Sequence, residues 1–213
     1  MNAAGFEIVE GALSAKDCDV LLASLGKNGG RAGARHLMRN PAVAAFARRR
    51  DLVSLAGGGV PYRATLFEKS GARNWLATWH QDTTLPLERR LDSPEWGPWS
   101  EKDGILYAHA PAWALRRITA LRIHLDASTP DNGPLRVIPG SHADGVLSDE
   151  DVFRRAREGT STTCLAGRGA VLAMRPLLIH ASVKAVGPAP RRVLHLEYAD
   201  TLRLSPGIAL TLA

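Results

Sequence analysis

The chain has little cysteine and no long apolar run, and these deficits exclude several classes of protein. Cys18 and Cys164 are too few for a disulfide framework and lack the paired spacing of a structural zinc site. No stretch of about 18 uninterrupted apolar residues could cross a bilayer. The first residues, MNAAGFE, lack the basic and apolar regions of a signal peptide. We therefore expect reduced thiols and a cytoplasmic protein without a membrane partner.

The remaining composition is that of one folded domain with a basic surface. A length of 213 residues with 45% hydrophobic content suffices for one sizeable core and predicts a single domain over 1–213. The net charge is +6, but the basic residues are spread along the chain, and the only run of three is Arg48, Arg49 and Arg50. Apolar residues flank this run, which predicts an exposed helix face or helix end. Since no nucleic-acid-binding signature accompanies it, we predict no nucleic-acid partner.

The first part of the chain, residues 1–60, shows mainly helical patterning after a short strand candidate over 6–10. Ser14 is suited to cap a helix whose apolar face has the spacing of one helical side: Cys18, Leu21, Leu22 and Leu25. Asn40 and Pro41 are suited to be the cap and first residue of a second helical stretch, which runs to about residue 55 with a break near Asp51. We expect these helices to pack on the outside of the rest of the domain.

From residue 61 to about residue 200 the pattern is that of short β-strands. Runs rich in branched and aromatic residues lie between turns, at 62–67, 74–80, 118–126, 135–138, 170–174, 177–180 and 192–198. Without intervening crossover helices, such strands favour a sandwich or a barrel. Residues 83–104 show no periodicity, so we expect a long loop that acts as a lid over a site formed nearby.

His80 and Asp82, with His180 far along the chain, form a metal-ligand pattern. Side chains two apart on an extended segment point to the same face, so His80 and Asp82 can converge on one ion. His180 ends an apolar run, where it could be a hydrogen-bonded core histidine or a third ligand. Two neutral imidazoles and one carboxylate on one face of a metal are typical of non-haem Fe(II) oxygenases.

The sequence around these residues resembles the phytanoyl-CoA dioxygenase family over roughly residues 60–200. The segments that carry the resemblance occur in the family's order and at compatible spacings: Trp79–Asp82 (WHQD), Asp131–Leu135 (DNGPL), Pro139–His142 (PGSH), His180–Ser182 (HAS) and Pro190–Arg191. The resemblance implies a mainly β fold, a double-stranded β-helix (jelly roll, cupin-like) with the N-terminal helices outside. It also implies that His80, Asp82 and His180 hold Fe(II).

The resemblance further implies 2-oxoglutarate and O2 as co-substrates. The expected reaction is hydroxylation of a C–H bond of a small molecule, with release of succinate and CO2. Halogenases of the same fold replace the carboxylate ligand by a small residue, so Asp82 favours hydroxylation.

The family spacing from the distal histidine assigns the far carboxylate of 2-oxoglutarate to Arg191. A planar guanidinium can hold a carboxylate through paired hydrogen bonds. Arg192 is the alternative, but it shares a strand face with three apolar or aromatic residues, Leu194, Leu196 and Tyr198. Matching to the family adds Ser182, Arg122 and Thr65 to the 2-oxoglutarate pocket, although an aromatic residue often stands at the position of Arg122.

The substrate side of the site is less defined. Arg122, His124 and Asp126 share one face of a predicted strand, so we expect all three to point into the barrel. His124 and His195 are candidate substrate residues, and interior hydrogen-bonded histidines are an equal alternative. These groups and the positive net charge favour an acidic or polar small molecule over a bare lipid.

Two other functions fit part of the pattern. A cupin-like metalloenzyme that works without 2-oxoglutarate would use the three ligands but would have no use for a buried Arg191. A non-catalytic binding or sensor protein on the same scaffold would have no chemical need for a complete set of ligands. The oligomeric state is not predicted by the sequence.

Overall fold

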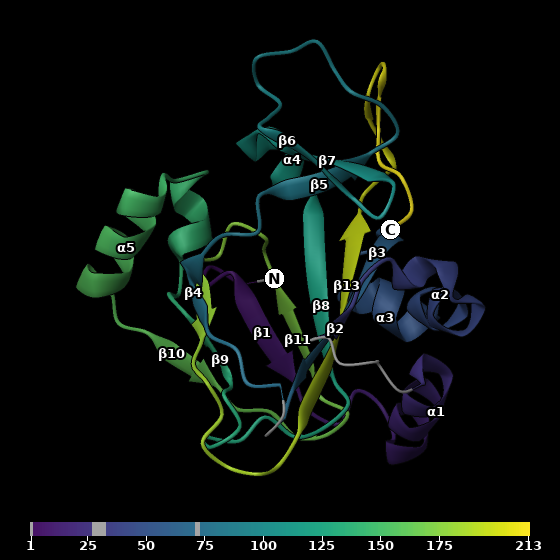
Figure 1. Ribbon diagram of the computed structural model, residues 1–213, viewed down its shortest axis with the longest axis vertical. Helices are drawn as coiled ribbons and strands as arrows, with labels where there is room; N and C mark the ends of the chain where they lie inside the picture. The colour runs from purple at the N-terminus through teal and green to yellow at the C-terminus, as the bar shows by residue number, and fades with distance from the viewer. Residues whose placement is uncertain (1, 27–32, 71–72) are drawn as a thin grey trace.

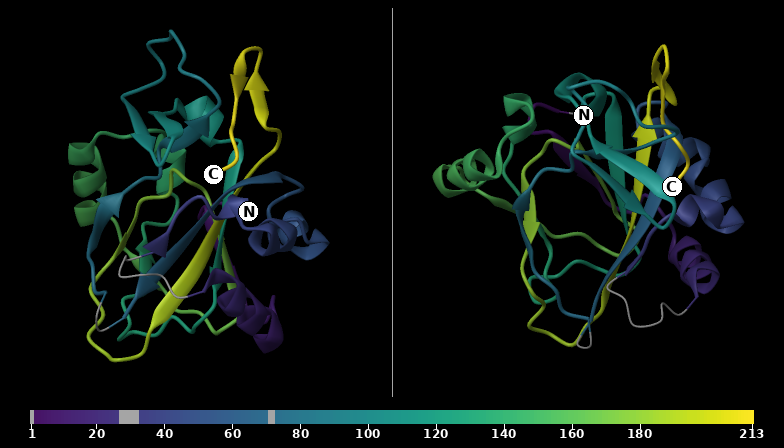
Figure 2. Two further views of the ribbon diagram at one scale, coloured as in Figure 1. Left: turned by 45° about the vertical axis from the view of Figure 1, so that its right-hand side comes forward. Right: turned by 45° about the horizontal axis from the view of Figure 1, so that its top comes forward.

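The computed structural model describes residues 2–26, 33–70 and 73–213, and its centre is a pair of antiparallel sheets (Figure 1). The larger sheet has the order β1-β11-β8-β13-β3-β2, with bounds Phe6–Val9, Val171–Met174, Ile118–His124, Arg191–Ala199, Val60–Lys69 and Gly33–Ala34. The smaller sheet has the order β10-β9-β12-β4, with bounds Thr162–Cys164, Leu135–Val137, His180–Ser182 and Ala77–His80. Figure 2 shows the two sheets facing each other. The mainly β, jelly-roll architecture is the expected one.

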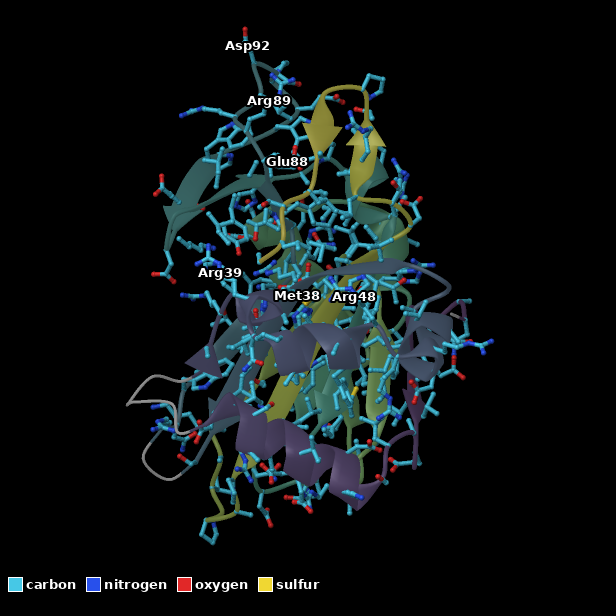
Figure 3. All side chains as sticks on the ribbon, turned by 90° about the vertical axis from the view of Figure 1, so that its right-hand side faces the viewer. Met38, Arg39, Arg48, Glu88, Arg89 and Asp92 are labelled. Atoms are coloured by element: carbon cyan, nitrogen blue, oxygen red, sulfur yellow. The ribbon has the colours of Figure 1, made fainter. Side chains whose placement is uncertain are left out.

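The N-terminal helices lie against the outer face of the larger sheet. They are α1, α2 and α3, with bounds Ala15–Leu25, Pro41–Ala47 and Arg50–Leu55. Ser14 caps α1 in a reciprocal capping box with Asp17, and Asn40 caps α2, as expected. Figure 3 looks onto this helix layer, where Met38 and Arg48 are labelled. Among the described residues no helix has the length and hydropathy required to span a membrane.

The arginine run 48–50 lies at a helix end. Arg48 follows α2 and Arg50 begins α3, so the second helical stretch is interrupted slightly before Asp51. Arg49 lies between the two helices and pairs with Asp17 of α1 at 2.6 Å and with Asp51 of α3 at 2.6 Å. Arg49 therefore ties α1 to α3, whereas Arg48 and Arg50 are exposed, as expected of a helix end.

Strict alternation along β13 separates the core from the site. Leu194, Leu196 and Tyr198 point outward and pack in one apolar cluster with the helices. Arg191, His195 and Glu197 are buried on the opposite, inner face. Residues 63–69 of β3 alternate in the same way, and their pairing with β13 puts Lys69 opposite Arg191 and Thr65 opposite His195. Polar groups of both strands therefore line the space between the two sheets.

Three expectations about elements are wrong. Residues 83–104 are not a featureless loop, because β5 (Thr84–Leu87) and β6 (Trp99–Lys102) pair with β7 (Ile105–His109) in a third sheet. The strand expected over 177–180 is displaced: Leu178 N–H donates to Arg175 O in a turn at Pro176, and β12 begins only at His180. The strand expected over 74–80 begins at Ala77.

The remaining elements lie at the periphery. They are α4 (Ala112–Leu115), α5 (Asp149–Glu158), the short 3-10 helices Leu37–Arg39 and Ser141–Asp144, and the hairpin of β14 (Arg203–Ser205) and β15 (Ile208–Ala209). Helix α5 was not predicted from the sequence, although Ser148 caps it and three acidic residues fill its first turn. Cys18 and Cys164 are buried free thiols, in agreement with the expected absence of a disulfide.

Candidate active site

His80, Asp82 and His180 come together at the junction of β4 and β12. His80 ends β4, Asp82 lies two residues later, and His180 begins β12 directly opposite His80. One ligand atom from each residue lies within 4.8 Å of the others. The Asp82 carboxylate is 3.9 Å from His80 Nε2 and 3.6 Å from His180 Nε2. Both separations are within the roughly 4.2 Å that one first-row metal ion with bonds of about 2.1 Å can bridge.

A hydrogen bond at Nδ1 of each imidazole determines the tautomer, and with it the state of the Nε2 atom that faces Asp82. His80 Nδ1 lies 2.7 Å from Thr78 O, and His180 Nδ1 lies 2.8 Å from Leu178 O. A carbonyl oxygen only accepts, so each Nδ1 carries the proton and each Nε2 has a free lone pair directed towards Asp82. This is the tautomer that a metal ligand requires.

Electrostatics keep His180 and Asp82 in their ligating forms. Burial lowers the pKa of the His180 imidazole to about 3, against the opposing effect of Asp82, so this ring is neutral at pH 7. The pKa of the Asp82 carboxyl is lowered in spite of its burial, because the nearby groups that can carry positive charge, His180 and His80 first and Arg63 after them, favour its ionised form. His180 is 4% exposed at its side chain, whereas His80 and Asp82 are 41% and 36% exposed. The cluster is therefore closed behind His180 and open in front of the other two residues.

Gln81, between the two ligands, joins the segments that carry them. Its Nε2 donates to Gly145 O and to Leu177 O, both at 2.8 Å, and its Oε1 accepts from Leu147 N–H at 2.9 Å. Asp82 N–H also donates to Pro176 O at 2.9 Å. These bonds hold the His80–Asp82 segment against the turn that leads into His180.

Replacing Gln81 by Leu is expected to destabilise the protein and weaken metal binding. The variant leaves two carbonyls and one N–H of the backbone without their partner, at a cost of about 1–3 kcal/mol. For a chain of this size, each kcal/mol lowers Tm by about 2–4 °C. Thermal unfolding followed by circular dichroism measures the shift. Gln81→Glu places a carboxylate oxygen against the two carbonyls that Nε2 bonds in the wild type, and should lower Tm at least as much as Leu. An unchanged Tm for Gln81→Leu would refute this role.

Three cationic side chains form a second cluster on the inner faces of β3, β8 and β13. Lys69 is 0%, Arg191 1% and Arg122 5% exposed. Lys69 Nζ donates to Ser182 Oγ at 2.9 Å and to Val183 O, Arg191 Nε donates to Asn132 O at 3.3 Å, and Arg122 lies 3.3 Å from His195 Nδ1. Among the described residues none of the three has a carboxylate partner. Because a buried charge without a counterion is unfavourable, this pocket is built to receive an anion.

The loop that holds Arg191 uses the Asn132-Gly133 turn. Gly133 has φ +69°, and a Cβ there would lie 2.5 Å from Val183 O and 3.2 Å from Lys69 Nζ. Glycine therefore allows both the left-handed backbone and the close approach of the turn to Lys69. Asn132 is held in turn by Thr129 N–H and Ala127 O.

Arg191 and Arg192 point to opposite faces of β13. Arg191 points inward to the cationic cluster, whereas Arg192 points the other way and forms a bidentate pair with Asp126, with both bonds at 2.7 Å. Asp126 was expected to point into the barrel; this is wrong, because β8 ends at His124 and the chain turns there. Ser182 and Thr65 are buried on the inner side, at 3% and 6% exposure.

The two candidate substrate histidines are both interior groups with partners. His195 lies between Arg122 and Glu197, with Nε2 at 3.2 Å from Glu197 Oε1. An arginine only donates, so His195 Nδ1 accepts and Nε2 carries the proton. His124 bonds to Ser128 Oγ at 2.9 Å through Nδ1, while its buried Nε2 has no partner. Burial, with Arg122 and Arg191 nearby, lowers the pKa of His124 to about 3.

Glu197 is the centre of a buried polar network that was not predicted from the sequence. It accepts from Tyr62 OH at 2.6 Å and pairs with Arg63 at 3.1 Å, in addition to His195. Burial opposes ionisation of Glu197, but Arg63 outweighs it and lowers the pKa of the carboxyl. The inward position of Glu197 on β13, two residues from His195, was the available signal. Lys69 was not predicted as a site residue either.

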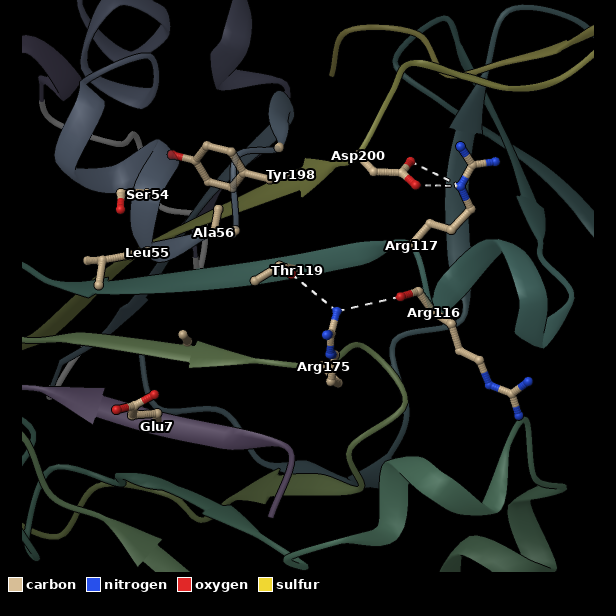
Figure 4. Close-up of a pocket in the computed structure, with 13 residues that line it drawn as sticks. Glu7, Ser54, Leu55, Ala56, Arg116, Arg117, Thr119, Arg175, Tyr198 and Asp200 are labelled. Carbon is tan, nitrogen blue, oxygen red and sulfur yellow. Dashed lines mark hydrogen bonds and ion pairs between the residues drawn. The ribbon is translucent and has the colours of Figure 1, made fainter. Parts of the chain in front are cut away.

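A separate cavity of about 380 Å³ lies on the outer face of the larger sheet (Figure 4). Two of its three arginines are already engaged: Arg117 pairs with Asp200 at 2.9 Å, and Arg175 donates to Thr119 Oγ1 at 3.3 Å. Tyr198, which lines it, faces the helix layer and donates to Ala47 O. This cavity is therefore on the opposite side of the sheet from the metal-ligand cluster.

Comparison with solved structures supports the fold. The chain is similar to AviO1 from Streptomyces viridochromogenes Tue57, with 22% identity, TM-score 0.67 and coverage of 92% of this chain and 90% of that one. It is similar to EctD from S. alaskensis with 2-oxoglutarate and 5-hydroxyectoine, with 20% identity, TM-score 0.68 and coverage of 92% and 72%. It is also similar to HygX from Streptomyces hygroscopicus with nickel and 2-oxoglutarate bound, with 16% identity, TM-score 0.63 and coverage of 93% and 84%.

A search of curated protein sequences finds no match. The family model described as phytanoyl-CoA dioxygenase (PhyH) matches residues 31–193, which is well over half of the chain and includes both the metal-ligand cluster and Arg191. Together with the similar folds and the His-Asp-His cluster, this match establishes the family. The chain belongs to the phytanoyl-CoA dioxygenase (PhyH) family of Fe(II)- and 2-oxoglutarate-dependent dioxygenases.

Proposed function

We propose that the protein hydroxylates a C–H bond of a small molecule, with conversion of 2-oxoglutarate and O2 into succinate and CO2. His80, Asp82 and His180 would hold Fe(II), and Arg191, Lys69, Arg122 and Ser182 would hold 2-oxoglutarate, with Thr65 lining its pocket. One observation carries the proposal: a cluster of two neutral imidazoles and a carboxylate shares the space between the sheets with three buried cations that have no carboxylate partner among the described residues.

The residues present fit both groups. The free Nε2 lone pairs and the Asp82 carboxylate form a donor set suited to Fe(II), which would supply the redox chemistry with O2 when bound. The exposed side of His80 and Asp82 leaves room for further ligands. Lys69 and Arg191 would orient the co-substrate by its far carboxylate, and Ser182 Oγ, already bonded to Lys69, would extend the same hydrogen-bonded surface.

The buried network of His195, Glu197 and Arg63 would give this pocket a fixed shape. His195 donates to Glu197 and accepts from Arg122, so it would hold the Arg122 guanidinium in place beside the co-substrate. A hydrogen-bonded wall of this kind would also exclude mobile water from the region behind the metal. His195 would thus act by positioning Arg122 rather than by direct contact with the substrate.

The two alternative functions are less well supported by the same observation. A cupin-like metalloenzyme without 2-oxoglutarate leaves three buried cations without a ligand to neutralise them. A non-catalytic binding protein has no need for two imidazoles held in the metal-binding tautomer. The proposed reaction is tested by incubating the Fe(II) protein with 2-oxoglutarate, ascorbate and metabolite pools and measuring succinate. Succinate formation that depends on a pool component is expected.

The affinity for 2-oxoglutarate should decrease as the pH rises. Burial, with Arg191 and Arg122 nearby, lowers the pKa of Lys69 to about 7 in the free protein. A bound carboxylate stabilises the charged ammonium and raises this pKa, so binding above about pH 7 takes up a proton and weakens by up to about tenfold per pH unit. Titration calorimetry in two buffers of different ionisation enthalpy measures the proton uptake. The uptake should be absent in Lys69→Met; equal uptake in both proteins would contradict the role of Lys69.

A further inference from the structure

Arg63 extends the positive charge of the site towards the third sheet. Its Nη1 lies 3.1 Å from Glu197 Oε1 and 3.2 Å from Thr84 O, and Thr84 follows the ligand Asp82 by two residues. The guanidinium is therefore placed beside the open side of the metal-ligand cluster. Its side chain is 17% exposed, so it faces a space that is nearly but not fully closed.

Lys102 and Arg63 both lie against the ring of Tyr107. The Arg63 guanidinium carbon is 5.2 Å from the centroid of this ring, and Lys102 Nζ is 4.9 Å from it. The Tyr107 hydroxyl bonds to the buried His36 at 2.9 Å, which fixes the ring. Burial and the nearby Arg63 lower the pKa of Lys102. Among the described residues Lys102 forms no ion pair with a carboxylate, and Asp103, its neighbour in the sequence, lies 3.8 Å from His36 instead.

The charges on this inner surface do not balance. Among the described residues, the cations of this surface include Lys69, Arg122, Arg191, Arg63 and Lys102, and the carboxylates beside them are Asp82 and Glu197. The charges of Fe(II) and of the 2-oxoglutarate dianion would cancel each other. Loading the site with both would therefore leave an excess of positive charge next to the open side of the metal, which favours a negatively charged third component.

We propose that the substrate is a small acid whose carboxylate or phosphate group binds to Lys102 and Arg63, the two cations that lie against the ring of Tyr107. This inference rests on the proposed function and names the substrate class of the same site. Lys102 supplies the uncompensated charge, and Arg63, already paired with Glu197, supplies further N–H donors in a fixed orientation. The C–H bond to be oxidised then lies on the part of the substrate that points towards His80 and Asp82.

Fractionation of metabolites by charge tests the substrate class. A metabolite extract is separated on an anion-exchange resin, and each fraction is added to the Fe(II) protein with 2-oxoglutarate and O2 while succinate is measured. Stimulation is expected from the retained, anionic fraction. Treatment of that fraction with a phosphatase distinguishes the two kinds of anionic group. Loss of stimulation identifies a phosphate, and unchanged stimulation identifies a carboxylate. Stimulation from the unretained fraction alone would overturn the proposal.

The variant Lys102→Met tests the location. It should raise the concentration of the anionic fraction needed for half-maximal stimulation by about tenfold or more, while the binding of 2-oxoglutarate stays unchanged. Lys102→Arg should restore most of the response. Lys16→Met removes an exposed lysine of α1 and serves as the matched control. Equal responses of Lys102→Met and Lys16→Met would overturn the assignment to Lys102.

A measurement without turnover separates this inference from the proposed function. Wild type and both methionine variants are dialysed against the anionic fraction, and retained small molecules are identified by mass spectrometry. Small molecules that are retained by wild type and Lys16→Met but lost from Lys102→Met support the anion site. They do so even if 2-oxoglutarate does not bind, and in that case only the proposed reaction is refuted. Identical retained species in all three proteins overturn the anion site even if 2-oxoglutarate does bind.

Discussion

Replacing Asp82 by Ala should abolish substrate-dependent succinate formation and weaken Fe(II) binding by more than about a hundredfold, since loss of a group that only supports a metal ligand already costs about 10–100-fold. Asp82 is the one carboxylate in the cluster, and both imidazoles face it, at 3.6 Å and 3.9 Å. Without it, two neutral nitrogens remain, which bind Fe(II) weakly because they carry no charge. Competition with a chromogenic chelator measures the affinity.

A surface carboxylate provides the control for Asp82. Asp200 pairs with Arg117 on the outer side of the larger sheet, at 2.9 Å, and its side chain is 55% exposed. Asp200→Ala should therefore bind Fe(II) as wild type does. His80→Ala and His180→Ala should resemble Asp82→Ala, and His180→Ala should in addition lower stability because that ring is buried. Full activity in Asp82→Ala would show that the cluster is not the metal site.

Replacing Arg191 by Ala should weaken 2-oxoglutarate binding while Fe(II) binding stays nearly intact. The lost hydrogen bonds to a charged group are worth about 1.5–3 kcal/mol, which corresponds to roughly a tenfold to more than hundredfold loss of affinity. Lys69 and Arg122 remain in the pocket, so the loss should not be complete. Titration calorimetry under anaerobic conditions measures the affinity.

Arg192 is the matched control, since it is adjacent in sequence and opposite in orientation. Its guanidinium pairs with Asp126 and does not reach the inner surface. Arg192→Ala should lower thermal stability slightly, because this pair is partly exposed, and should leave the 2-oxoglutarate affinity unchanged. A defect in Arg192→Ala with normal binding in Arg191→Ala would contradict the arrangement of β13.

The sequence was sufficient to predict the features that depend on local periodicity. The two-residue alternation of β13 correctly separated Arg191 from Arg192, because one face of that strand is apolar and packs on the helices. The helix starts at Ser14 and Asn40 were predictable because capping is a local hydrogen bond. The ligand pattern was predictable because His80 and Asp82 are two residues apart on an extended segment.

Features that depend on long-range pairing were not predictable. Nothing in the sequence next to Lys69 marks it as a site residue, and only the pairing with Arg191 across β3 and β13 places it in the pocket. The role of Glu197 could not be predicted, because its partners Tyr62 and Arg63 lie far from it in the sequence. The third sheet was not predicted because its strands are short. The segment between the paired strands β5 and β7 is also rich in proline and glycine.

The central claim is that one Fe(II) at His80, Asp82 and His180 and one 2-oxoglutarate at Arg191 and Lys69 occupy the same site. Anaerobic titration of 2-oxoglutarate into the Fe(II) protein, followed by the metal-to-ligand charge-transfer absorption band, tests it most directly. We expect a band that saturates at one 2-oxoglutarate per iron, is absent in Asp82→Ala and requires higher concentrations in Arg191→Ala. No band in the wild-type protein at millimolar 2-oxoglutarate would contradict the claim.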